Sequence, residues 1–333
     1  MANQKNIFKK KKTAIFAVIL FTVLLGGVFG YQLYDANKVH RLTITTNPIS
    51  ELPPHPHNPG EDSIEARGHH ILTHSDKFVT KEDMWIRGFN VNVINANGNI
   101  IHHLYLGRTD KKDSLCPNYD WQALFVTSEV NMRAQLFFAD YGMFVPKGTP
   151  LKIFAMLHNP DRPLGPGRTF KKVSAQVTVY YQKNNPFVKH TPVEYHRMHL
   201  SDRPCENEEQ GEVFAVPSYT PHYTKENSTV NGISTSSYTF PTSGTIIGVG
   251  GHFHPFEGGR NVELILNNKL LYTFTAVEQD SNGWKVWDTP IFPQVFRVNK
   301  NDTISIKANY SNDNPYSVKG AMGMGVFYFA PDN

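Results

Sequence analysis

RGFNVNVINANGNIIHHLYLG, residues 87–107, is the stretch that decides the fold class. Two runs rich in β-branched and aromatic residues flank Asn97-Gly98, and Asn-Gly is the dipeptide that most readily adopts the positive φ angles of a type I′ turn. The stretch therefore predicts two antiparallel strands joined as a β-hairpin. A second stretch, LILNNKLLYTF at 264–274, predicts another tight hairpin that turns at Asn267-Asn268.

Short runs of the same kind recur along the chain, with turn clusters between them. Hardly any segment shows the 3.6-residue apolar period of an amphipathic helix. The 24 glycines and 22 prolines punctuate the sequence about as often as an all-β protein needs turns. We therefore predict an all-β chain with two antiparallel jelly-roll or β-sandwich domains after an N-terminal transmembrane helix.

The N-terminal segment differs in composition from the rest of the chain. Five lysines precede the first acidic residue, Asp35, while the formal net charge of the whole chain is +4, so the remainder carries about −1 (4 minus 5). This charge distribution argues against nucleic-acid binding, which requires a basic face within the folded part.

Residues 14–31 contain no charge and are long enough to span a bilayer as a helix. The preceding lysines predict that the N-terminus stays in the cytoplasm. A cleaved signal peptide is the alternative, although VFGYQ at 28–32 is a poor cleavage site. Both readings predict export, and we expect a single-pass membrane anchor with the folded domains outside the cytoplasm, in the periplasm of a bacterium.

We predict the following domain organisation: a basic tail at 1–12, a transmembrane anchor at 13–32, a Pro-rich linker at 33–64, a first β-sandwich at 65–190, an interdomain connection at 191–225 and a second β-sandwich at 226–333. His55 and His57 in the linker are expected to be solvated. Cys116 and Cys205 are the two cysteines. An exported chain permits a disulfide, but the sequence leaves open whether they pair.

GVGGHFHPFEGGRN, residues 248–261, raises the question of a metal site. On a strand, His252 and His254 point to the same face, so both imidazoles can reach one ion. The flanking glycines leave room for a ligand or substrate to approach the backbone. A pair of exposed histidines, or of histidines with ordinary hydrogen bonds, is the alternative reading.

Four further residues are possible metal ligands. His102 and His103 are adjacent, so both can bind one metal only if their strand bulges or ends there. His158 ends an apolar run, and Met324 lies in GAMGMGVFYFAP at 320–331. Each of these residues could instead be part of the core. Imidazole together with thioether sulfur favours copper over zinc.

In this order, an H-H strand, a third histidine, an H-x-H strand and a late methionine, the chain resembles the copper type II, ascorbate-dependent monooxygenases. That family includes peptidylglycine α-hydroxylating monooxygenase and dopamine β-monooxygenase. The resemblance covers about residues 85–333 and rests on IIHHLYLG, LKIFAMLHNP, GHFHPFEGG and MGMGVFYF. The family places a tyrosine four residues after its methionine ligand, and here Tyr328 follows Met324 by four, which favours Met324 over Met322.

The resemblance implies two copper ions, one on each of two jelly-roll domains that face each other across a solvent-filled cleft. It implies that ascorbate or another one-electron reductant reduces both ions, and that a substrate C–H bond is hydroxylated with O2. It assigns the first copper to His102, His103 and His158, and the oxygen-binding copper to His252, His254 and Met324. Tyr328 is the one candidate catalytic residue on the substrate side, with a core tyrosine as its alternative.

The chain also departs from the family pattern. Gly250 stands where the peptide-amidating enzyme has a substrate-binding arginine, and Val326 stands where it has a polar residue. Peptidylglycine is therefore not the expected substrate, which stays an unknown small molecule or peptide. The chain looks like a divergent, membrane-anchored bacterial relative.

Other classes of protein stay open beside the enzyme. A non-catalytic protein that stores, delivers or senses copper would use the same residues, and so would an adhesion module with vestigial metal sites. A cupin would carry its acidic residue further from the H-x-H pair, and an amidohydrolase would need a (β/α)₈ barrel. His69, His70 and His74 form another cluster, which we interpret as a domain edge.

Overall fold

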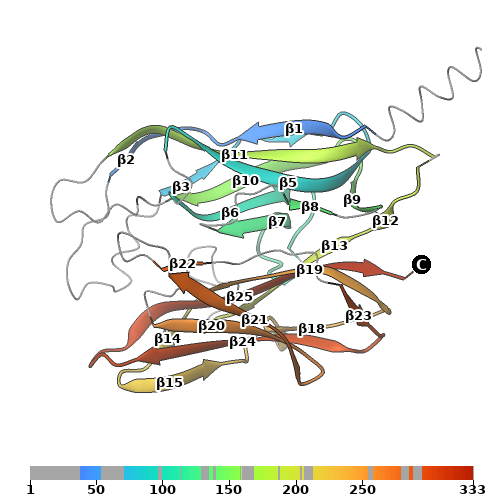
Figure 1. Ribbon diagram of the computed structural model, residues 1–333. Coiled ribbons are helices and arrows are strands. Elements are labelled where there is room, and N and C mark those ends of the chain that lie inside the picture. The colour runs from blue at the N-terminus through green and yellow to red at the C-terminus, as the bar shows by residue number, and fades with distance from the viewer. Residues whose placement is uncertain are drawn as a thin grey trace, which may run out of the picture.

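The computed structural model describes residues 38–53, 71–96, 100–113, 115–128, 135–137, 140–157, 159, 169–186, 188–202, 205, 213–253, 258–278, 285–287 and 295–332. Their regular structure consists of strands, and none of these residues lies in an α-helix. The all-β prediction is confirmed (Figure 1). The predicted anchor at 13–32 lies outside the described residues, among which no helix is long and apolar enough to cross a membrane.

The first domain is a sandwich of two sheets. One sheet has the order β1-β11-β5-β9-β12, with β2 and β8 paired at its sides, and the other has the order β3-β10-β6-β7, with β4 beside β10. All of these pairs are antiparallel except β12 with β9. The strands are β1 (His40–Thr45), β2 (Ile49–Leu52), β3 (Ile71–His74), β4 (Phe78–Val79), β5 (Met84–Ile94), β6 (Ile101–Arg108), β7 (Gln122–Ser128), β8 (Gln135–Leu136), β9 (Tyr141–Val145), β10 (Pro150–Leu157), β11 (Phe170–Lys183) and β12 (Thr191–Pro192).

The second domain is also a two-sheet sandwich. One sheet has the order β13-β25-β19-β23 with β14 beside β25, and the other has the order β15-β24-β20-β21-β22 with β18 beside β24. A separate hairpin pairs β16 with β17. The strands are β13 (Glu194–Leu200), β14 (Val213–Val216), β15 (Thr220–Lys225), β16 (Thr229–Val230), β17 (Ile233–Ser234), β18 (Ser237–Thr239), β19 (Gly244–Phe253), β20 (Gly259–Leu266), β21 (Lys269–Glu278), β22 (Lys285–Trp287), β23 (Phe296–Val298), β24 (Thr303–Asn312) and β25 (Val318–Pro331).

The two predicted hairpins have different outcomes. β20 and β21 pair with Leu266 opposite Lys269, and Asn267 and Asn268 have φ angles of 50° and 64°. Positive φ at both central residues is the type I′ pattern, so this hairpin is confirmed. The hairpin predicted at 87–107 is wrong, because β5 pairs with β11, β9 and β8 whereas β6 pairs with β10 and β7. β5 and β6 therefore belong to different sheets of the sandwich, and the turn dipeptide Asn97-Gly98 itself lies outside the described residues.

The sheet topology shows that the domain boundaries differ from those predicted from the sequence. β1 and β2 come from the segment predicted as linker, yet both pair with β11 in the first domain. β13, β14 and β15 come from the segment predicted as interdomain connection, yet they belong to the second sandwich. The alternation in HRLTIT at 40–45 is a strand pattern, which the nearby proline-rich composition obscures. In sequence, the domains therefore meet between β12 and β13, near Val193.

The β13-β25-β19 sheet of the second domain faces the first domain, and the two sandwiches are stacked in Figure 1. From Ala321 to Ala330, the even-numbered apolar residues of β25, such as Met324 and Tyr328, pack with the core of the first domain, while odd-numbered ones, such as Phe327 and Phe329, pack in the core of the second. Burial on both faces explains why GTIIGVGGHF and VKGAMGMGVFYFAP read as continuous apolar runs rather than as alternating ones.

Glycine is required at Gly251 by packing rather than by ligand access. A Cβ atom added there would lie 2.4 Å from the Phe274 ring, which fills the space in the second core. The interpretation of this glycine as room for a substrate is therefore corrected.

Candidate metal centre between the two domains

His102 and His103 lie at the start of β6, at a β-bulge. In the ladder with β10, Met156 lies opposite His103 and Leu157 opposite Ile101, so the register shifts and His102 has no residue opposite it. This bulge is the irregularity that the sequence required for two adjacent histidines to share one side of a strand. The ring centroids are 4.2 Å apart, so the two imidazoles lie side by side.

His252 of β19 joins this pair from the second domain. Its ring centroid is 4.6 Å from that of His103 and 6.0 Å from that of His102. The three residues are only 3%, 5% and 6% exposed in the order His102, His103, His252. The H-H and H-x-H motifs therefore meet in a buried seam between the domains.

The spacing of the rings can be compared with that around a metal ion. A metal–nitrogen bond of about 2.0–2.1 Å places an imidazole centre roughly 3.2 Å from the ion, so two bound rings lie about 4.5–6.4 Å apart for bond angles from about 90° to 180°. The observed separations of 4.2, 4.6 and 6.0 Å are close to this range. The resemblance implied two sites across a solvent-filled cleft, but the described imidazoles instead form one buried group.

Met324 lies beside His252 in the sheet. It is directly opposite His252 on β19 and directly opposite His199 on β13, so the three side chains are in one row on the face toward the first domain. Side chains at directly opposite positions have Cβ atoms about 4.5–5.5 Å apart. Met322 instead lies opposite Val213 of β14. Of the two methionines, Met324 is the one whose sulfur is placed to join the histidine group.

Two predicted ligands, His158 and His254, lie outside the described residues. They directly follow Leu157, the last residue of β10, and Phe253, the last residue of β19. His69 and His70 also lie outside, whereas His74 is an exposed residue of β3, opposite Phe154 of β10.

Tyr328 occupies the same face of β25 as Met324, about 13 Å further along the strand. It is buried, with its ring 5.1 Å from that of Phe137 and 5.5 Å from that of Tyr195. Its hydroxyl has no hydrogen-bonding partner within the described part of the chain, and burial raises the pKa of the phenol. These surroundings favour the alternative role of a packing residue between the domains.

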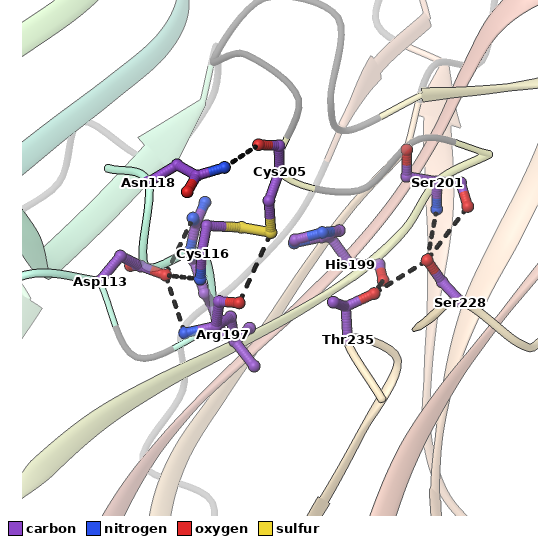
Figure 2. The surroundings of a disulfide bond; sticks show 10 residues. Asp113, Cys116, Asn118, Arg197, His199, Ser201, Cys205, Ser228 and Thr235 are labelled. Carbon is purple, nitrogen blue, oxygen red and sulfur yellow. Dashed lines mark hydrogen bonds and ion pairs between the residues drawn. A yellow bond between two sulfur atoms is a disulfide. The ribbon is translucent and has the colours of Figure 1, made fainter. Parts of the chain in front are cut away.

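A disulfide joins the two domains next to this site (Figure 2). Cys116 belongs to the connection from β6 to β7, and Cys205 follows β13, so the bond crosses the interface with a Cα–Cα distance of 5.1 Å. The side-chain amide of Asn118 donates a hydrogen bond to the carbonyl of Cys205 at 3.3 Å. The pairing that the sequence left open is thereby decided.

Sequence reasoning missed His199, which lies between the disulfide and Met324. One of its ring nitrogens is within 4.8 Å of the sulfur atoms of both Cys116 and Cys205, and Figure 2 shows the ring directed at the disulfide. The residue is fully buried, and burial, followed by the charge of Arg197, lowers the pKa of the imidazole to about 3. The stretch EYHRMHL at 194–200 gave no clear signal, because this strand is buried on both faces over its last four residues and its sequence does not alternate.

A buried ion pair also crosses the interface. Arg197 of β13 lies 3.4 Å from the carboxylate of Asp113, and both side chains are almost inaccessible to solvent. The same carboxylate accepts hydrogen bonds from the backbone amides of Leu115 and Cys116, at 3.0 and 2.8 Å. The guanidinium also lies over the ring of Tyr119, 5.5 Å from its centroid. Asp113 thus connects the loop that carries Cys116 to the second domain.

No protein-family model and no curated protein matches this chain. Among solved structures, a peptide-N(4)-(N-acetyl-β-D-glucosaminyl)asparagine amidase aligns over 88% of this chain and 97% of its own, with 9% identity and a TM-score of 0.38. The major capsid protein P2 of bacteriophage PM2 aligns over 88% and 98%, with 6% identity and a TM-score of 0.35. PNGase F from Flavobacterium meningosepticum aligns over 86% and 96%, with 8% identity and a TM-score of 0.34. Likenesses at this level carry no argument about function.

Proposed function

We propose that this chain is a membrane-anchored, exported copper protein that oxidises a substrate C–H bond with O2, in the manner of the copper type II monooxygenases it resembles. The observation that supports the proposal most is the meeting of His102 and His103 with His252 in one buried group. The two motifs are far apart in sequence and belong to different domains, yet their imidazoles are adjacent in the fold.

The donor set suits copper. Three imidazoles and the thioether of Met324 gather without a carboxylate ligand among the described residues of the group. Imidazole binds both oxidation states of copper, and thioether sulfur favours Cu(I). The resemblance divides the ligands between two ions, with His102, His103 and His158 for one and His252, His254 and Met324 for the other. Because the ring of His252 lies 4.6 Å from that of His103, we propose that these two sets of ligands bind copper in one shared group. Copper bound there would supply one-electron redox chemistry toward O2, with ascorbate or a similar reductant as the electron donor.

The residues beside this group bear on the substrate. Gly250 and Val326 lie directly opposite each other, one position along the same face from His252 and Met324. The positions that bind substrate in the peptide-amidating enzyme therefore adjoin each other here and are apolar. We propose a small molecule or peptide substrate that is held without a carboxylate contact at these two positions.

The disulfide supports the proposed location. Disulfides persist in oxidising compartments and are rare in the cytosol. A covalent bond between Cys116 and Cys205 is thus consistent with folded domains outside the cytoplasm. The resemblance also leads us to propose jelly-roll topology for both sandwiches.

A second candidate function is copper binding without turnover. The exposures of 3–6% at the three histidines favour it, because a substrate could reach the metal only if the seam opened. Such a protein would store, deliver or sense copper through the same ligands.

One experiment separates the two candidates. The purified full chain is loaded with copper, and oxygen consumption is followed with ascorbate and a broad panel of small molecules and peptides. His252→Ala serves as the ligand variant and His222→Ala, an exposed position on β15, as the matched control. Turnover that His252→Ala abolishes supports the enzyme. Stoichiometric copper without turnover supports the binding protein, and a chain that takes up no copper contradicts both.

A further inference from the structure

The disulfide between Cys116 and Cys205 and the imidazole of His199 form a second group of metal-binding atoms, separate from the histidine seam. A nitrogen of His199 lies within 4.8 Å of both sulfurs. In Figure 2 the ring projects from β13 toward the bond, which joins loops of the two domains. All three residues are buried.

His199 has no ordinary structural role for its ring. Neither ring nitrogen has a hydrogen-bonding partner within the part of the chain that the structure describes. Its backbone, by contrast, is fully engaged, with the amide donating to Thr235 and the carbonyl accepting from the Thr235 hydroxyl. A buried imidazole without partners costs free energy that an apolar residue of the same size would avoid. Buried polar atoms of this kind call for a specific explanation, and a bound ion is one of the recognised ones.

The residue opposite His199 in the sheet carries a soft sulfur donor. Met324 lies directly opposite His199 on β25, so a thioether is the next donor on the same face. Thiolate and thioether sulfur with one imidazole is a donor set for Cu(I) rather than for hard cations such as magnesium or calcium. A neighbouring charged pair is already occupied: Arg197 lies 3.4 Å from the carboxylate of Asp113, which also accepts from the backbone amides of Leu115 and Cys116.

We propose that reduction of this disulfide opens a Cu(I) site in which the sulfurs of Cys116 and Cys205 and a ring nitrogen of His199 bind the ion. A dithiol reductant supplies two electrons and two protons, the S–S bond breaks to give two thiols, and the reductant becomes a disulfide. Each thiol then releases its proton as Cu(I) binds. Metal–sulfur bonds of about 2.3 Å place two thiolates roughly 3.8 Å apart, so the sulfurs need to separate by less than about 2 Å.

The proposed site would exchange one interdomain link for another. In the oxidised protein the covalent bond holds the loop after β13 to the loop after β6. In the reduced protein the bound ion would hold the same two loops, with β13 supplying the imidazole. This inference does not rest on the proposed monooxygenase function, because its three ligands are Cys116, Cys205 and His199, none of which the proposed function uses; Met324 adjoins both groups but is not one of these ligands.

The test compares Cu(I) binding by the oxidised and reduced full chain. The anaerobic protein is treated with a phosphine reductant, thiols are counted by labelling, and Cu(I) alone is titrated against a colorimetric chelator. We expect reduction to release two thiols and to add one tightly bound Cu(I), with sulfur ligands visible by X-ray absorption. His199→Leu should lower the affinity for the added Cu(I) at least about tenfold, since even the loss of a residue that only hydrogen-bonds to a metal ligand lowers metal affinity by that much.

The controls separate this site from the seam and from misfolding. His252→Ala should retain the added ion and His222→Ala should leave it unchanged. Reduced wild type whose thiols are then alkylated should lose it, and this needs no variant to fold. Near-ultraviolet circular dichroism monitors the fold throughout. A disulfide that stays closed in the folded protein, equal Cu(I) uptake in both redox states, added uptake that survives His199→Leu, or binding of zinc but not Cu(I) would each overturn the proposal.

Discussion

The ring of His252 in the second domain lies 4.6 Å from the ring of His103 in the first, and this contact joins the two histidine motifs. The β-bulge at His102 contributes to it by turning both first-domain imidazoles toward the seam. Metal binding and the interface between the domains are therefore expected to depend on each other.

Removing a histidine from either domain should weaken the same metal site. We expect His103→Ala and His252→Ala each to lower copper affinity at least about tenfold, because each removes a direct ligand of one shared group. Isothermal titration with Cu(II) measures the change, and His222→Ala is the control. If His252→Ala left copper binding by the first domain fully intact, the two motifs would be independent sites.

The two methionines of β25 provide a matched pair. Met324→Leu should lower Cu(I) affinity while changing the free energy of unfolding by less than about 1.5 kcal/mol, since Leu and Met have similar volumes. Met322→Leu should leave the affinity unchanged because Met322 lies opposite Val213 rather than His252. Chelator competition measures both variants. Equal losses for the two would remove Met324 from the proposed ligands.

Because His199 is buried, we expect the folded protein to lose stability as the pH falls. Its pKa is about 3 in the folded protein, against an ordinary value of 6.5, so below pH 6.5 the unfolded chain binds a proton that the folded chain does not. The stability that His199 contributes is complete above pH 6.5 and falls as the pH drops toward 3, by up to about 1.4 kcal/mol per pH unit. Urea unfolding of the metal-free, oxidised protein at pH 7, 6 and 5 should show a shallower pH dependence for His199→Leu. An unchanged slope would mean that the imidazole is already protonated or solvated.

The disulfide should stabilise the joined domains strongly. It closes a loop with a sequence separation of 89, for which the chain-entropy model gives about 4–5 kcal/mol. We expect Cys116→Ser with Cys205→Ser to lower the free energy of unfolding in denaturant by several kcal/mol. Asn118→Ala, which removes one neighbouring hydrogen bond, should cost only about 1 kcal/mol. Equal effects of the two changes would show that the crosslink adds little.

Removing one partner of the Arg197–Asp113 ion pair should destabilise the fold strongly, whereas removing both charges should destabilise it little. Arg197→Met leaves the carboxylate of Asp113 buried without its partner, and we expect a loss of about 3–5 kcal/mol. Adding Asp113→Asn should recover most of the loss, because the amide oxygen still accepts from Leu115 and Cys116 without carrying charge. Thermal unfolding of the single and double variants measures the difference. Additive losses would argue against a direct interaction.

Several features followed from local sequence. The type I′ turn at Asn267-Asn268 is set by residues that tolerate positive φ, and the all-β class by short runs between turn clusters. The requirement for a bulge at His102 and His103 followed from the two-residue period of a strand. These features depend on a residue and its immediate neighbours, which is the information that a sequence pattern carries.

Other features depended on residues far apart in the chain. The run at 87–107 contains the turn dipeptide Asn-Gly, yet its two strands do not pair with each other. β5 pairs with β11 and β6 pairs with β10, so residues distant in sequence determine the pairing. The approach of His252 to His103, and the position of His199 beside the disulfide, arise only where one face of the second domain packs on the first. Sequence thus determined the strands, their turns and the donor types, whereas tertiary packing decided which donors meet, because no local preference encodes the register between two domains.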